Sequence, residues 1–138
     1  MKPTEELIHE HEVILHVVSA AANEAQRIRG GQAARAALIA MMLDFFRNFT
    51  DACHHAKEEK HLFPALEKRG LAHDSGPLAV MLAEHREGRR LLARIAGLLP
   101  TATQGEKATD QAIGEDLSSY VQLLENHIAK ENNILFPL

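Results

Sequence analysis

The sequence predicts an all-α protein in which four helices form an up-down-up-down four-helix bundle. The chain has 138 residues, which is the size of one domain. Along four segments, apolar residues recur at alternating spacings of three and four, as in helices that bury one face. Short breaks with glycine or proline separate the segments, and short connections favour antiparallel neighbours. We therefore expect residues 1–138 to form a single bundle domain.

The first two predicted helices occupy the first half of the chain. The first should begin after Thr4 and end at Gly30-Gly31. Its buried face would consist of Leu7, His11, Ile14, Val18, Ala21, Ala25 and Ile28. The second should run from about Gln32 to Arg69, with Gly70 as its C-terminal cap. Because proline lacks a backbone N–H, we expect Pro64 to kink this helix or end it locally.

The other two predicted helices follow the break at residues 74–77, where Pro77 suits a first helical turn. The third helix would bury Leu78, Met81, His85, Gly88, Leu92, Ile95 and Leu99. A loop is expected from Pro100 to Lys107, because this stretch is rich in threonine and glycine. The fourth helix should begin near Thr109 or Asp110. Its buried face would consist of Ile113, Leu117, Tyr120, Leu124, His127, Glu131 and Ile134.

Composition excludes some classes of partner. The formal net charge of −4 gives no electrostatic reason to bind nucleic acid or an anionic membrane. No apolar run is long enough for a signal peptide or a membrane span. The single cysteine, Cys53, cannot form an internal disulfide, which is consistent with the reducing cytoplasm. Nine histidines are unusual in a chain of this length, and histidine is the commonest metal ligand.

One string of residues occurs twice. Residues 54–64 and 127–137 share the pattern H-x-A-K-E-x-x-x-L-F-P. On a helix, the histidine and the glutamate of this pattern lie on one face, about one turn apart. Each string also has an upstream Glu-His pair: His11 precedes the first string by 43 residues, and His85 precedes the second by 42. The chain therefore reads as two helical hairpins, each with a lone inward histidine and an inward His/Glu pair.

Six inward donors of this kind could hold two metal ions. They are His11, His54, Glu58, His85, His127 and Glu131. A carboxylate on an apolar face is costly unless it is paired or bound to metal. Two octahedral ions need about twelve positions, of which four imidazoles, two bridging carboxylates and a bridging oxygen would fill roughly ten. The remainder would admit dioxygen, nitric oxide or peroxide. Mixed imidazole and carboxylate donors favour iron, with manganese or zinc as alternatives.

Two neighbouring assignments stay open at this point. His55 and Glu59 have the same spacing as His54 and Glu58, although helical phase and the repeat alignment favour the latter pair. His61 lies two turns after His54 on nearly the same face. It is either an extra ligand or a residue that packs near the expected kink, and we favour packing.

The motifs together resemble the hemerythrin-like HHE cation-binding domain. The resemblance rests on residues 7–14, on the doubled string and on Ala83-Glu84-His85, and it covers essentially the entire chain. It implies a bundle with two non-haem irons held by the six donors, with Glu58 and Glu131 as bridges. Oxygen-carrying hemerythrins have a further histidine where this chain has Met81, and an aspartate where it has Glu131. This set is more similar to the di-iron domains of iron–sulfur repair proteins, nitric-oxide-response proteins and eukaryotic iron sensors.

We therefore expect a cytoplasmic non-haem di-iron protein that binds or senses dioxygen, nitric oxide or peroxide, or that handles iron. An alternative is an enzyme that reduces peroxide or nitric oxide or assists iron–sulfur repair, which would need electrons from a redox partner. A metal-free alternative is a helical interaction module whose histidines pack or titrate. Neither nucleic acid nor a membrane is expected as a partner.

Overall fold

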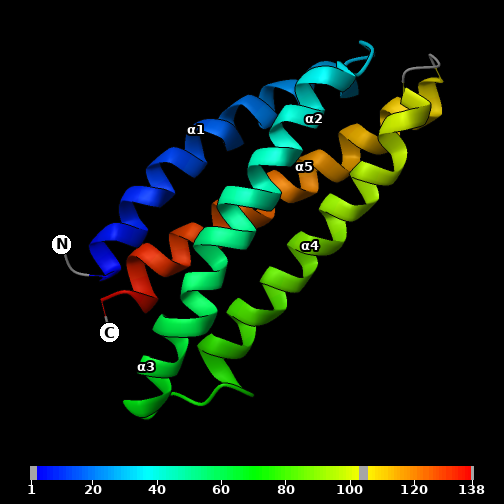
Figure 1. Ribbon diagram of the computed structural model, residues 1–138. Coiled ribbons are helices and arrows are strands. Elements are labelled where there is room, and N and C mark those ends of the chain that lie inside the picture. Colours follow the sequence, from blue (N-terminus) through cyan, green and yellow to red (C-terminus); the bar gives the residue numbers. More distant parts are fainter. Residues whose placement is uncertain (1–2, 103–105, 138) are drawn as a thin grey trace.

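The computed structural model describes residues 3–102 and 106–137, and these ranges form an all-α bundle of four long helical stretches (Figure 1). The stretches are α1 (Pro3–Arg29); α2 (Ala36–Phe45), continued by η1 (Phe46–His55), η2 (Glu58–Leu62) and α3 (Phe63–Lys68); α4 (Gly76–Ala102); and α5 (Lys107–Lys130), continued by η3 (Glu131–Leu135). Successive stretches run in opposite directions, and α5 packs along both α1 and α4. The predicted up-down-up-down bundle is confirmed.

Two apolar clusters form the interior. The larger one lies toward the α1–α2 connection and includes Ile28, Phe46, Ile95 and Ile113. The smaller cluster consists of Phe63, Leu66, Leu78, Met81 and Leu135. On each helical stretch, the candidate donors lie between the residues of the two clusters or next to the last residue of one cluster. A polar layer is therefore enclosed by apolar packing.

Several helix ends differ from the sequence prediction. The first helix begins at Pro3, in keeping with the preference of proline for a first turn. The third continues through Pro100 to Ala102, so the predicted loop is wrong for residues 100–102, whereas residues 103–105 lie outside the described part. In this last turn the Thr101 hydroxyl donates to the Leu98 carbonyl, 2.8 Å away, and so caps the helix end. The fourth helix begins at Lys107, about one turn earlier than predicted.

The second stretch is not a regular α-helix. Residues 46–55 and 58–62 are π-helical, with backbone hydrogen bonds from residue i+5 to residue i, and the α form returns at Phe63. Pro64 lies in the first turn of α3 and does not end the helix, which continues to Lys68. The second repeated string also turns π-helical, over η3, where the Phe136 N–H donates to the Glu131 carbonyl at 2.8 Å. Both strings thus turn π-helical at the glutamate that they share.

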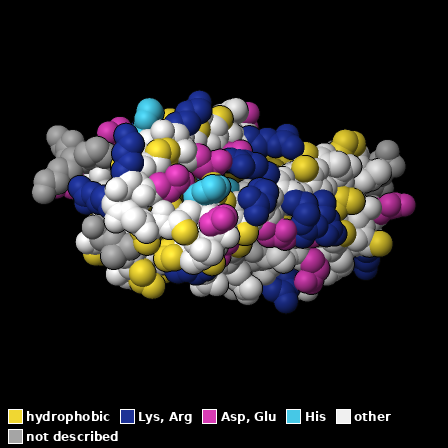
Figure 2. All heavy atoms as spheres, turned by 90° about the horizontal axis from the view of Figure 1, so that it is seen from below, with side chains coloured by type: hydrophobic (Ala, Val, Ile, Leu, Met, Phe, Trp, Pro, Cys, Tyr) yellow, Lys and Arg dark blue, Asp and Glu magenta, His cyan; other side chains and the backbone are white. Residues whose placement is uncertain are grey.

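The outer surface carries both signs of charge. On the face shown in Figure 2, basic and acidic side chains are interspersed along the molecule, with scattered apolar groups between them. No helix in the described ranges is long and apolar enough to cross a membrane.

The second stretch begins at Ala36, and not near Gln32, because a buried carboxylate holds the chain just before it. Glu24 is fully buried and accepts hydrogen bonds from the Arg35 backbone N–H at 2.8 Å and from the Arg35 Nε at 2.9 Å. Arg27 Nη1 donates to the same carboxylate at 2.7 Å. Burial raises the pKa of Glu24, but the bonds from Arg35 and Arg27 outweigh it and hold the pKa below 4.5.

We predict that Glu24→Gln lowers the free energy of unfolding by about 2 kcal/mol near neutral pH, because charge-assisted hydrogen bonds are lost. The stabilisation from a carboxylate with a lowered folded-state pKa is present above 4.5 and is lost as the pH falls through the folded value. The wild-type and variant proteins should therefore converge in acid. Urea denaturation at several pH values tests this, with Glu125→Gln on the exposed surface as the control. An equal difference in stability at every pH would contradict it.

Candidate metal centre

All six predicted donors are buried, and they converge in the interior together with one more histidine. The exposed fractions are 1% for His11, 1% for His54, 0% for Glu58, 2% for His85, 1% for His127 and 0% for Glu131. His55 is 6% exposed and belongs to the same layer. α1 and α4 contribute one histidine each, and the other donors come from the second stretch and from the end of the fourth.

The donor atoms form two groups suited to two ions. One group contains His55, Glu58, His85 and His127, and the other contains His11, His54, Glu58 and Glu131; within each group the ligand atoms lie within 4.8 Å of one another. Glu58 belongs to both. Its Oε1 lies 3.1 Å from the Nε2 of His85, while its Oε2 lies 3.6 Å from the Nε2 of His54. The two oxygens of one carboxylate thus face different groups, as a bridging ligand requires.

Glu131 occupies the corresponding place on the opposite side. Its Oε1 lies 3.1 Å from the Nε2 of His11 and 3.4 Å from the Nε2 of His127. All four carboxylate oxygens of Glu58 and Glu131, and the Nε2 of His11, are buried without a hydrogen-bond partner among the described residues. Buried polar atoms of this kind are costly when unpaired, and cations would satisfy them. The residues present therefore fit a pair of metal ions.

The outward nitrogens of the five histidines all face oxygen acceptors. Each Nδ1 lies beside one partner: Asn132 Oδ1 for His11 (2.8 Å), Glu10 Oε1 for His54 (2.8 Å), Asp51 Oδ1 for His55 (3.4 Å), Glu59 Oε2 for His85 (2.9 Å) and Glu84 Oε1 for His127 (2.9 Å). An Nδ1–H that donates outward leaves the Nε2 lone pair directed inward. This is the usual arrangement of metal-binding histidines.

The residues that support the histidines also explain the lysine of the repeated motif. Lys57 Nζ donates to Glu10 Oε2 at 2.5 Å, and Lys130 Nζ donates to Glu84 Oε2 at 2.6 Å. Each lysine of the repeated string therefore fixes the glutamate that holds the histidine of that same string. These roles were not predicted from the sequence. The lysine shared by the two strings and the glutamate of each Glu-His pair were the pattern that could have indicated them.

Electrostatics keeps three of the inward histidines neutral, which is the form that binds metal. Burial lowers the pKa of His54 to about 4 and also lowers the pKa of His55 and of His85, so these imidazoles are neutral near pH 7. Burial also acts to lower the pKa of His127, but the carboxylates of Glu131 and Glu84 outweigh it and raise the pKa to about 9. Burial, together with the nearby Glu131, raises the pKa of Glu58. Protons thus balance the charge of the metal-free layer, and metal ions would displace them.

His55 also faces inward, although the prediction from helical phase favoured His54 over it. That prediction assumed the α-helical step of about 100° per residue. In the π-helical η1 the turn is wider and the step is smaller, so His54 and His55 both face inward. Glu59 is not a partner of His55 at the centre and instead supports His85 from outside.

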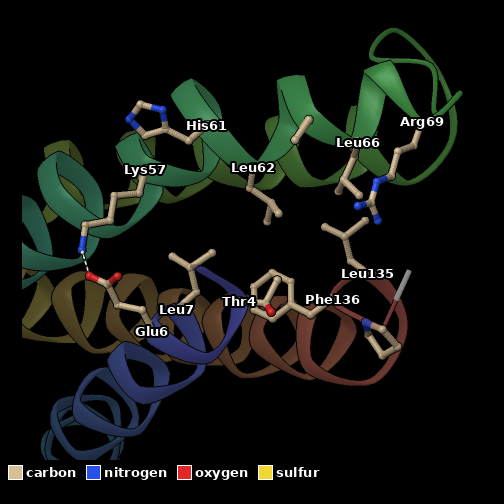
Figure 3. A pocket seen from close by; sticks show the side chains of 12 residues that line it. Thr4, Glu6, Leu7, Lys57, His61, Leu62, Leu66, Arg69, Leu135 and Phe136 are labelled. Carbon is tan, nitrogen blue, oxygen red and sulfur yellow. Dashed lines mark hydrogen bonds and ion pairs between the residues drawn. The ribbon is translucent and has the colours of Figure 1, made fainter. Parts of the chain in front are cut away.

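His61 does not join the centre. It is exposed and borders a cavity of about 840 Å³ between the start of α1, the end of the second stretch and the C-terminal segment (Figure 3). Leu62 and Leu66 point into this cavity from one side, and Phe136 points into it from the other. The Phe136 ring also stacks on His11, with ring centroids 5.5 Å apart, and so separates the cavity from the donors.

Sequence comparison agrees with this geometry. The chain belongs to the hemerythrin HHE cation binding domain family, whose profile matches residues 2–138. The resemblance seen in the motifs is thereby confirmed.

Curated relatives cover most of the chain. An uncharacterised protein of Mycobacterium tuberculosis is 25% identical over 133 residues, which is 96% of this chain and 51% of that protein. The iron-sulfur cluster repair protein YtfE of Edwardsiella ictaluri is 34% identical over 118 residues, 84% of this chain and 53% of that protein. The chain therefore spans about half the length of these relatives. No solved structure matches the chain at a significant level.

We predict that His55→Ile weakens the binding of one metal ion by at least about tenfold, because it removes an inward imidazole. Isoleucine is the residue at the matching place in the second string, Ile128, so it is compatible with a buried helix position. Metal titration of the purified variant measures the effect. His61→Ile is the matched control and should bind metal as the wild type does. Equal binding by all three proteins would show that His55 is no ligand.

Proposed function

We propose that this chain binds two non-haem iron ions and that the centre binds or senses a small oxidant: dioxygen, nitric oxide or peroxide. The observation that carries the proposal is the position of Glu58, whose two oxygens face separate groups of inward histidine nitrogens. The ligands would be the six residues predicted from the sequence together with His55.

The donor set supports iron and leaves room for a small ligand. Five imidazoles and two bridging carboxylates would fill roughly nine of the about twelve positions of two octahedral ions. Imidazole and carboxylate together suit iron, which when bound supplies redox chemistry toward small oxidants. The names of the YtfE relatives, which are iron-sulfur cluster repair proteins, favour iron over manganese or zinc. As part of the proposal the protein works in the cytoplasm, where the free thiol of Cys53 stays reduced.

The residues of this chain have separable tasks in that function. The Nε2 atoms and the two carboxylates bind the ions, and the outward Nδ1 bonds orient the rings. The apolar clusters on either side exclude water from the charged layer, which strengthens every electrostatic interaction inside it. The stacked ring of Phe136 shields the His11 side from the neighbouring cavity.

An enzyme is the second candidate function. The similarity to YtfE proteins favours a role in iron–sulfur repair, and the same centre would serve to reduce peroxide or nitric oxide. Either reaction needs electrons from a redox partner. Turnover in the presence of a chemical reductant separates an enzyme from a simple sensor or carrier.

We predict that protein purified without added metal contains about two irons per chain and absorbs visible light through ligand-to-iron charge transfer. Elemental analysis and an optical spectrum in air check this directly. If the protein contains no metal and takes up no ferrous iron under anaerobic reconstitution, the proposal fails and a metal-free interaction module remains.

Glu131→Gln distinguishes the metal centre from the metal-free module. If the protein is a metal-free module, Glu131 interacts only with neighbouring side chains such as His127, so the effect of its neutral isostere on stability should be the same with and without iron. With ions bound, loss of a bridging ligand should lower metal content and remove the stabilisation that bound metal gives. Thermal unfolding with and without iron measures both effects. A variant that retains two irons would refute a bridging role for Glu131.

A further inference from the structure

At four of the positions where the two halves of the chain differ, one member of each pair lies close to the others in space. Aligning His54 with His127 pairs Asp51 with Leu124, His55 with Ile128 and Glu59 with Asn132, and aligning His11 with His85 pairs Leu15 with Arg89. Each pair sets a charged or titratable side chain against an apolar or neutral one. The four charged or titratable side chains, which are Asp51, His55, Glu59 and Arg89, belong to a single network.

The centre of this network is Arg89, which bridges two carboxylates. Its Nε donates to both oxygens of Asp51, at 2.9 and 3.0 Å, and its Nη2 donates to Glu59 Oε2 at 2.6 Å. Asp51 supports His55, and the same oxygen of Glu59 supports His85. The two imidazole rings stack with centroids 3.9 Å apart and planes at 15°. One arginine thus holds the supports of two adjacent histidines.

The four matching residues provide no such network. Leu124 and Ile128 are 2% and 4% exposed and belong to the larger apolar cluster. Leu15 is a partly exposed apolar residue on α1. Asn132 supports His11 with a neutral amide oxygen in place of a carboxylate.

The two groups of donors therefore differ in kind. All three histidines of the first group are supported by carboxylates: His55 by Asp51, His85 by Glu59 and His127 by Glu84. The second group has two histidines, of which only His54 is supported by a carboxylate. A carboxylate behind the ring makes an imidazole a stronger donor, and this difference favours the first group. Each group has four donors, and the third imidazole of the first group takes the place that Glu131 has in the second.

We propose that the two metal positions are inequivalent, and that Arg89 is the positioning residue of the tighter one, formed by His55, His85 and His127. Asp51 and Glu59 would repel each other beneath the stacked rings if the guanidinium did not neutralise both. Arg89 is 42% exposed, so its ion pairs contribute little to folding stability and its main effect is on the orientation of the two rings. The inference rests on the proposed function, because it concerns the same two ions.

Anaerobic titration of the metal-free full chain with cobalt(II), followed by its visible spectrum, tests the inference. Wild-type protein should bind two equivalents in two distinguishable steps. Arg89→Gln should weaken the tighter step by about 10- to 100-fold and leave the weaker step unchanged. Arg89→Lys should recover part of the loss, since an ammonium keeps the charge but not the bidentate geometry. Arg90→Gln is the matched control, because the neighbouring Arg90 pairs with Glu87 on the surface.

The outcomes separate this inference from the proposed function. A wild-type protein that binds no metal refutes the proposed function itself. A wild-type protein that binds two ions in indistinguishable steps, or an Arg89→Gln variant that keeps the wild-type profile, overturns the inference alone. If Arg89→Gln weakens both steps equally and lowers the melting temperature of the metal-free protein, Arg89 is a general structural residue. That result also overturns the inference.

Discussion

The whole interior is organised around two carboxylates buried among five imidazoles. Glu58 and Glu131 are fully buried, and none of their oxygens has a hydrogen-bond partner among the described residues. Such an arrangement would be strongly unfavourable in a purely structural core, where apolar residues of similar volume would serve better. The helices therefore have to hold a polar layer that only protons or cations can balance. The apolar clusters on either side supply the folding energy that the layer itself does not.

The support of that layer is reciprocal between the two hairpins. Within each hairpin, the glutamate of the Glu-His pair holds the histidine of the repeated string, and the lysine of the string fixes that glutamate. Between hairpins, Glu59 holds His85 and Asn132 holds His11. Four of the five ligand rings are thus oriented by a helical stretch other than their own, whereas His55 is supported by Asp51, one turn earlier on its own stretch. Local distortion of one stretch would misorient ligands on another.

Much of this could be read from the sequence, because helical periodicity and an internal repeat are both local signals. The spacing of apolar residues defined the four helices. The repeated string and the Glu-His pair upstream of each copy identified Glu58 and Glu131 together with four of the five inward histidines. His55 stayed only an alternative to His54 because its orientation depends on π-helical hydrogen bonding in η1, which side-chain periodicity does not reveal. Arg89 was missed for another reason. Its partners, Asp51 and Glu59, are 38 and 30 residues away and meet it only in the folded bundle. The proline at position 100 likewise did not mark the end of α4, and the Thr101 hydroxyl donates to the Leu98 carbonyl in that last turn.

The exchange of supports between hairpins gives the fold an internal twofold symmetry. Each hairpin carries a lone histidine and a repeated string. The residue after the glutamate of each string supports the lone histidine of the other hairpin, so the supports are complete only when two such hairpins associate. Two identical copies related by a twofold axis would satisfy every bond of this kind, as isologous dimers do. The present chain has the connectivity of such a dimer joined end to end. Asp51, His55, Glu59 and Arg89 are the positions at which the present chain departs from that twofold symmetry.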